Sequence, residues 1–122
     1  MKSLIVPLFA LVLLALTPAA AFAETAPPTL LHVVTVQWKA GTTAEQIQAA
    51  LDGVKALPAK YPGIVHVWTK SIKVQGGKAN AFVMEFSDEA AFKAYTDSPA
   101  QKEWYKIYLP IRQESTTFDI IN

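Results

Sequence analysis

The sequence predicts an α+β domain of ferredoxin-like topology, in which a four-stranded antiparallel sheet carries helices on one face. Two observations support this fold class. The apolar patterns follow one another in the order strand, helix, strand, strand, broken helix, strand, which is the order of a split βαβ arrangement. The strand segments are also apolar on both faces, so each face of the sheet should be covered. We therefore expect the chain's own helices on one face and a second copy of the protein on the other.

The first strand is expected at residues 30–38, where β-branched and aromatic residues follow one another without a breaker. Successive side chains of a strand point to opposite faces of the sheet. His32 and every second residue from there to Trp38 should therefore share one face. The residues between them are also largely apolar and should share the other face.

The first helix is expected after Thr42 and Thr43, each of which is followed three residues later by a side chain that can complete a capping box. Its apolar side recurs at helical spacing, at Ile47, Ala50, Leu51, Val54 and Leu57. Pro58 fits only near the end of such a helix, and the Tyr-Pro-Gly segment at residues 61–63 stops it.

The second and third strands are expected at residues 64–73 and 80–86, joined by a glycine-rich turn into an antiparallel hairpin. Alternation along the second strand places Ile64, His66 and Trp68 on one face. Alternation along the third places one set of four side chains together, namely Asn80, Phe82, Met84 and Phe86.

The second helical segment is expected to be broken in two. Ser87 should cap the first half, which has acidic residues in its first turn, and Ser98 followed by Pro99 should start the second half. The residues expected to face inward are Phe92 and Tyr95 in the first half and Ala100, Trp104, Ile107 and Tyr108 in the second. A closing strand is expected at residues 115–121.

Residues 1–23 have the pattern of a secretory signal peptide. Lys2 gives a positive start, residues 4–16 form an apolar run too short for a comfortable transmembrane helix, and a small-x-small cleavage site follows. We therefore expect a periplasmic or secreted protein without a stable membrane anchor. Residues 24–29 should form a short lead-in, and residues 30–122 a single domain.

Charge and cysteine content exclude several classes of protein. Without the signal peptide, ten basic side chains face ten acidic ones, so the electrostatic basis for binding nucleic acid is missing. The absence of cysteine excludes disulfide bonds and thiolate metal sites. His32 and His66 lie on strands that the expected order separates by a third, roughly 10 Å apart, so they cannot share a metal ion. We expect no metal and no cofactor.

Several short segments carry a family resemblance through their order and spacing. They are His32-Val33-Val34, the helix ending from Leu57-Pro58 to Pro62-Gly63, Phe86 before the acidic Asp88-Glu89, Tyr95, Ser98-Pro99-Ala100 and Phe118-Asp119. Together they resemble the stress-responsive dimeric A/B barrel (Dabb) domain family, over residues 30–121. The resemblance implies a ferredoxin-like protomer whose sheet pairs with that of a second copy, which forms a dimeric α/β barrel.

The resemblance also implies where chemistry could lie. One branch of this family consists of plant polyketide cyclases, which use histidines and tyrosines lining a cavity between sheet and helices. His32 and Tyr95 match a histidine and a tyrosine of that branch. Asn80 and Gln101 stand where two further cyclase histidines would be, and an amide cannot accept the proton as that chemistry requires. We therefore do not expect cyclase activity by that mechanism.

Three functions remain open from the sequence. The residues expected to line a cavity between sheet and helices are His32, Asn80, Phe82, Met84, Phe92, Tyr95 and Trp104, and they favour the binding of a small apolar or aromatic molecule. A small enzyme of lyase, isomerase or cofactor-free oxygenase type would instead use His32 and Tyr95 as its catalytic pair. If the aromatic residues fill a solid core, His32 is a hydrogen-bonded structural histidine and the protein is purely structural.

Overall fold

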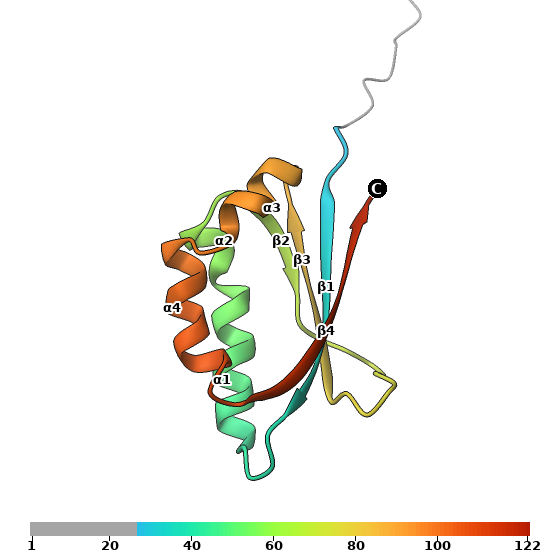
Figure 1. The fold of residues 1–122 in the computed structure, drawn as a ribbon, viewed down its shortest axis with the longest axis vertical. Coiled ribbons are helices and arrows are strands. Elements are labelled where there is room, and N and C mark those ends of the chain that lie inside the picture. The colour runs from blue at the N-terminus through green and yellow to red at the C-terminus, as the bar shows by residue number, and fades with distance from the viewer. Residues whose placement is uncertain (1–26) are drawn as a thin grey trace, which may run out of the picture.

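The computed structural model describes residues 27–122, which form one sheet with four helices on a single face (Figure 1). The elements are β1 (Leu30–Trp38), α1 (Ala44–Lys55), α2 (Leu57–Lys60), β2 (Ile64–Trp68), β3 (Asn80–Phe86), α3 (Glu89–Tyr95), α4 (Pro99–Tyr108) and β4 (Arg112–Ile121). All strand pairs are antiparallel, in the order β2-β3-β1-β4. The predicted ferredoxin-like α+β fold is confirmed. The predicted signal peptide and residues 24–26 lie outside the described residues.

The first helical segment starts as predicted but is divided near its end. Thr43 and Gln46 form a reciprocal capping box at the start of α1. Ala56 separates α1 from α2, and Pro58 lies in the first turn of α2, where its missing N–H and fixed φ are tolerated. The proline therefore begins a new turn of helix instead of ending the old one.

β2 is shorter than predicted and irregular. Its pairing with β3 shifts register between Ile64 and His66, so Val65 is an extra residue on this strand. The bulge reverses the alternation beyond it: Ile64 is buried beneath the helices, whereas His66 and Trp68 lie on the opposite face and Val67 packs against the core. The prediction that Ile64, His66 and Trp68 share one face is therefore wrong.

The two halves of the second helical segment are capped by different residue types. The carboxylate of Asp88 accepts from the backbone N–H of Ala91 at 2.7 Å, so Asp88 and not Ser87 caps α3. The predicted cap of α4 is confirmed, because the Ser98 hydroxyl accepts from the backbone N–H of Gln101 at 3.2 Å.

The hydrophobic core lies between the helices and one face of the sheet. Its buried members are Leu30, Val34, Val36, Trp38, Ala50, Leu51, Val54, Leu57, Ile64, Phe82, Met84, Phe86, Tyr95, Ala100, Trp104, Tyr108 and Ile111. The predicted alternation of β1 and β3 is thereby confirmed. Ile107, which was expected to face inward, is 46% exposed. No helix within residues 27–122 has the length and apolar character needed to cross a membrane.

The other face of the sheet has no helix over it, since all four helices lie on one side (Figure 1). Three large apolar side chains on this outer face are about half exposed: Trp68 at 51%, Phe118 at 55% and Ile120 at 51%. Phe118 pairs with Val33 across β1 and β4, so the apolar surface continues over the neighbouring strand. An apolar sheet face of this kind usually has a partner surface.

Candidate functional site

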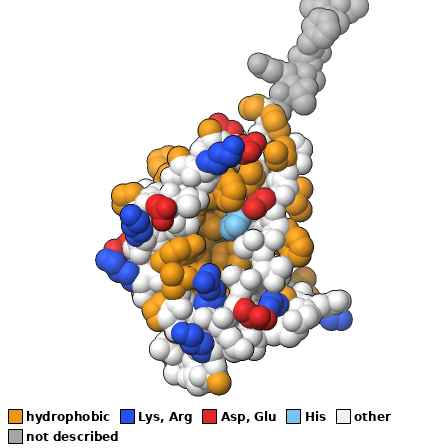
Figure 2. All heavy atoms as spheres, viewed as in Figure 1, with side chains coloured by type: hydrophobic (Ala, Val, Ile, Leu, Met, Phe, Trp, Pro, Cys, Tyr) orange, Lys and Arg blue, Asp and Glu red, His pale blue; other side chains and the backbone are white. Residues whose placement is uncertain are grey.

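A cavity of about 240 Å³ lies between the sheet and helices α3 and α4. Its lining residues are His32, Val34, Phe82, Met84, Phe92, Tyr95, Thr96, Gln101, Trp104, Tyr105, Tyr108, Arg112, Ser115 and Thr117. Figure 2 shows apolar side chains gathered in a hollow on this side of the molecule, with one histidine at its wall. Six of the seven residues predicted to line a cavity do so, and Asn80 does not.

Asn80 instead forms a hydrogen bond with a tryptophan of the hydrophobic core. The indole Nε1 of Trp38 donates to its Oδ1 at 2.7 Å, which satisfies a donor that would otherwise be buried without a partner. Asn80 pairs with Val36, whereas the cavity residue Met84 pairs with His32. Asn80 therefore lies on the predicted face but further along the strand, away from the other site residues.

His32 forms a pair with Asp119 at the wall of the cavity. The two residues are directly opposite across β1 and β4, and His32 Nδ1 lies 2.5 Å from Asp119 Oδ1. The His32 side chain is 17% exposed, and its ring centroid lies 5.2 Å from that of Phe92. A proton on Nδ1 that is donated to the carboxylate leaves Nε2 as an acceptor, which is the arrangement a general base needs.

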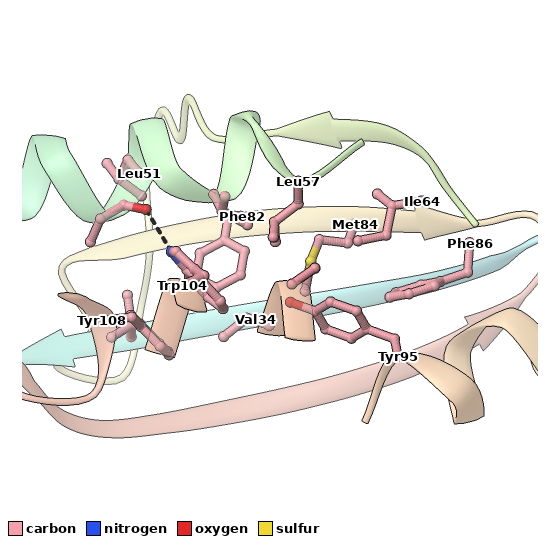
Figure 3. Packing of buried hydrophobic residues seen from close by; sticks show 14 of the residues in the cluster. Val34, Leu51, Leu57, Ile64, Phe82, Met84, Phe86, Tyr95, Trp104 and Tyr108 are labelled. Carbon is pink, nitrogen blue, oxygen red and sulfur yellow. Dashed lines mark hydrogen bonds between the residues drawn. The ribbon is translucent and has the colours of Figure 1, made fainter. Parts of the chain in front are cut away.

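Two phenol hydroxyls at the cavity have no hydrogen-bond partner among the described residues, those of Tyr95 and Tyr108. Both residues are 3% exposed, and burial raises the pKa of each phenol above its usual value. Figure 3 shows the Tyr95 ring entering the apolar layer with its oxygen directed away from Phe86. An unsatisfied buried hydroxyl costs about 1–3 kcal/mol, so both groups favour an occupant that can accept a hydrogen bond.

Gln101 and Tyr105 form a fixed polar link in the same wall. Gln101 Oε1 accepts from the backbone N–H of Asp97 at 2.7 Å, and its Nε2 donates to the Tyr105 hydroxyl at 3.2 Å. Asp97 has a positive φ of 63° in the turn between α3 and α4, and this hydrogen bond supports that turn. The Tyr105 hydroxyl accepts in this link, so its own proton remains available to a ligand.

Arg112 is the one side chain in the lining with a permanent charge, and the lining includes no carboxylate. Its guanidinium carbon lies 5.4 Å from the ring centroid of Tyr108. Arg112 was not among the predicted site residues, because the closing strand was expected to start at residue 115, whereas β4 begins at Arg112 itself. Arg112 is the chain's single arginine, and this was the signal that could have drawn attention to it.

Asp119 was also missed as a partner of His32. Its contact with His32 depends on pairing between residues 87 positions apart, which no local pattern reveals. The available signal was a lone acid within the apolar and hydroxyl-bearing residues 115–121. The pairing of β1 with β4 turns that isolated acid into the partner of a cavity residue, His32.

The second histidine belongs to a separate cluster on the outer face. His66 Nδ1 lies 2.7 Å from Glu85 Oε2, and the Thr29 hydroxyl donates to Glu85 Oε1 at 2.7 Å. These two contacts, with Thr29 the stronger, hold the pKa of Glu85 below its usual value. Over residues 27–122, no three histidine or carboxylate side chains meet in a group that could hold a metal ion.

Comparison with known proteins places the chain in a family. The family described as "Stress responsive A/B Barrel Domain" matches residues 30–122. Among solved structures, the chain is similar to the hydroxynitrile lyase from Passiflora edulis, with 18% identity and a TM-score of 0.69 over 77% of this chain and 93% of that one. It is also similar to a dimeric ferredoxin-like protein of unknown function from Thermobifida fusca, with 19% identity and a TM-score of 0.67 over 82% of this chain and 96% of that one.

A third similar structure is a Dabb family protein with a ferredoxin-like fold from Mesorhizobium loti, with 20% identity and a TM-score of 0.66 over 79% of this chain and 98% of that one. No curated protein sequence matches significantly. The structural likenesses, at these identities, establish the fold, whereas the family match spans every strand and helix described above. The chain therefore belongs to the stress-responsive A/B barrel (Dabb) domain family.

Proposed function

We propose that this protein binds a small apolar or aromatic molecule in the cavity between its sheet and its helices. The observation that carries the proposal is an aromatic-lined cavity of about 240 Å³ into which two buried phenols bring unpaired hydroxyls. An apolar cavity of about 150 Å³ is large enough to accept benzene, so this one has room for a ring with a short substituent. A cavity of this size also argues against a filled, purely structural interior.

A ligand screen with a cavity-filling variant tests the proposal. Thermal denaturation of the mature protein should shift upward with aromatic and short polyketide-like compounds, because a ligand that binds only the folded state stabilises it. Thr117→Phe should abolish the shift, since Thr117 lines the cavity from the open edge of β4. Ala49→Phe places the same ring on the exposed side of α1 and should leave the shift intact. Equal shifts in both variants would rule out this cavity as the binding site.

The protein acts as a homodimer in this proposal, joined through the outer face of the sheet. The half-exposed Trp68, Phe118 and Ile120 supply an apolar surface, and the similar Thermobifida fusca structure is described as dimeric. Light scattering should give twice the chain mass, and Phe118→Glu should reduce it to the monomer mass. Ile107→Glu, a charge introduced at a similarly exposed apolar residue on the helical side, should leave the dimer intact. A native monomer at micromolar concentration would refute the dimer.

The same proposal places the mature protein in the periplasm or outside the cell. Its support is the signal-peptide pattern of residues 1–23, which lie outside the described part of the chain. The intact mass of the exported product should correspond to a chain that starts at Glu24. A product that retains the leading apolar run would contradict export with cleavage.

The His32–Asp119 pair favours a second function, that of a cofactor-free enzyme of lyase, isomerase or oxygenase type. His32 Nε2 would accept a proton within the apolar cavity, and Tyr95, whose pKa burial raises, would remain a neutral hydrogen-bond donor. Hydroxynitrile cleavage is the first reaction to assay, because a protein of similar fold is a hydroxynitrile lyase.

Replacing each histidine in turn separates the two functions. His32→Ala should remove turnover while ligand binding persists if the protein is an enzyme. His66→Ala is the matched control, since His66 also pairs with a carboxylate but on the other face of the sheet. Turnover that survives His32→Ala would exclude His32 as the base.

A further inference from the structure

We infer that the ligand of this cavity is an aromatic monocarboxylate, whose carboxylate binds Arg112 and whose ring lies among the aromatic side chains. The inference rests on the proposed binding function and assigns a chemical class to its ligand. It follows from three properties of the lining: its charge, its unpaired donors and its apolar wall.

The single positive charge in the lining favours a ligand with a single negative charge. Arg112 is partly buried and lines a cavity that has no carboxylate in its wall. The ion pairs found within residues 27–122 all use other cations, and Asp119 is engaged by His32. A partly buried guanidinium without a counter-ion favours an anion beside it. One arginine matches the charge of a monocarboxylate, whereas a phosphate group would bring more negative charge than the lining balances.

The donors in the lining also match a carboxylate. The guanidinium presents a planar fork of N–H groups that fits the two carboxylate oxygens, which together accept about four hydrogen bonds. The hydroxyls of Tyr95 and Tyr108 are buried, unpaired within the described residues and part of the same wall. Arg112 and Ser115 lie near the Tyr108 phenol, so the guanidinium, the serine hydroxyl and this phenol lie together at the β4 end of the cavity.

The remainder of the cavity suits a flat ring. Phe82, Met84, Phe92 and Trp104 contribute apolar surface from β3, α3 and α4. Trp104 is fixed, because its Nε1 donates to the backbone oxygen of Ala50 at 2.9 Å and its ring stacks on Tyr108 at a centroid distance of 4.3 Å. A rigid aromatic wall together with a single cation is the combination that selects a compact aromatic acid over an aliphatic or neutral compound.

Paired probes that differ only in charge test the inference. Benzoate and phenylacetate should bind the mature protein about ten- to a hundredfold more tightly than benzamide and phenylacetamide, measured by calorimetry, because hydrogen bonds to charged groups contribute that range of affinity. Arg112→Gln should abolish the preference for the acids and leave amide binding unchanged. Arg112→Lys keeps the charge without the planar fork and should retain part of the preference.

Lys106→Gln is the matched control, since it removes one positive charge from the exposed side of α4 and should leave the preference intact. Circular dichroism and thermal denaturation establish that each variant is folded. Amides that bind as tightly as the acids, or a preference that survives Arg112→Gln, would overturn the inference while the binding function stands. If neither class of probe binds, the binding function itself fails, and the inference fails with it.

Discussion

Replacing Gly53 by alanine tests how closely helices α1 and α4 pack behind the cavity. A Cβ at Gly53 would lie 2.7 Å from Cδ1 of Trp104 and 3.0 Å from Cδ1 of Ile107, so the indole would have to move. The indole is held by its hydrogen bond to Ala50 and by stacking on Tyr108. Alanine within a helix is about 1 kcal/mol more favourable than glycine, whereas overpacking a core costs about 1–3 kcal/mol. Because the indole is fixed, we expect the free energy of unfolding to fall by about 1 kcal/mol.

Chemical denaturation at one fixed protein concentration measures this change, since the stability of a dimer depends on concentration. A double-mutant cycle identifies the cause. In a Trp104→Leu background the clash is relieved, so Gly53→Ala should now stabilise the protein by up to about 1 kcal/mol through helix propensity alone. The same substitution in the native background should also weaken ligand binding, because the displaced indole lines the cavity. Stabilisation by Gly53→Ala in the native background would refute close packing at this contact.

Three further predictions concern stability, each measured by chemical denaturation. Asp88→Ala should lower the free energy of unfolding by about 1 kcal/mol through loss of the α3 cap, whereas Ser87→Ala should have little effect. Burial raises the pKa of Tyr95 above its usual 10.0, so the contribution of the neutral phenol to the free energy of unfolding is complete below pH 10.0 and is lost as the pH rises above it. Tyr95→Phe should therefore reduce the loss of stability at alkaline pH. The pKa of Glu85 is held below its usual 4.5, so the contribution of the Glu85 carboxylate to the free energy of unfolding is present above pH 4.5 and is lost as the pH falls below it. Glu85→Gln should therefore reduce the loss of stability at acid pH.

The inward-facing side chains could be predicted for β1 and β3, which alternate regularly, but not for β2, which contains a bulge. Alternation placed the inward side chains of β1 and β3 correctly because each strand is regular along its pairing with the other. In β2, residues 64–68 have apolar side chains at both odd and even positions, so either alternation fits the sequence. The pattern alone therefore did not reveal the extra residue. A bulge is decided by how the strand fits its neighbour and the helices above it, and this information is not local.

The cavity shows the same division between local and long-range information. Most of its aromatic lining was predictable, since helical spacing and strand alternation fix the direction in which a side chain points. Position along a strand was not predictable in this way. Asn80 lies four residues from Met84, roughly 13 Å along an extended strand, so a residue on the correct face is still remote from the site. Arg112 and Asp119 come from β4, whose pairing with β1 joins the two ends of the domain.

The pairing of β1 with β4 links the proposed site to the proposed dimer. His32 and Asp119 point toward the helices, whereas the next residues along, Val33 and Phe118, form a pair on the outer face. A slip of one residue would exchange these faces, bringing Phe118 into the cavity and an acidic side chain to the apolar surface. The register that gives the outer face its apolar surface is therefore the register that forms the histidine–carboxylate pair. β4 is an edge strand, and edge strands are the easiest to displace, so a partner that covers the outer face would also hold the cavity wall in place.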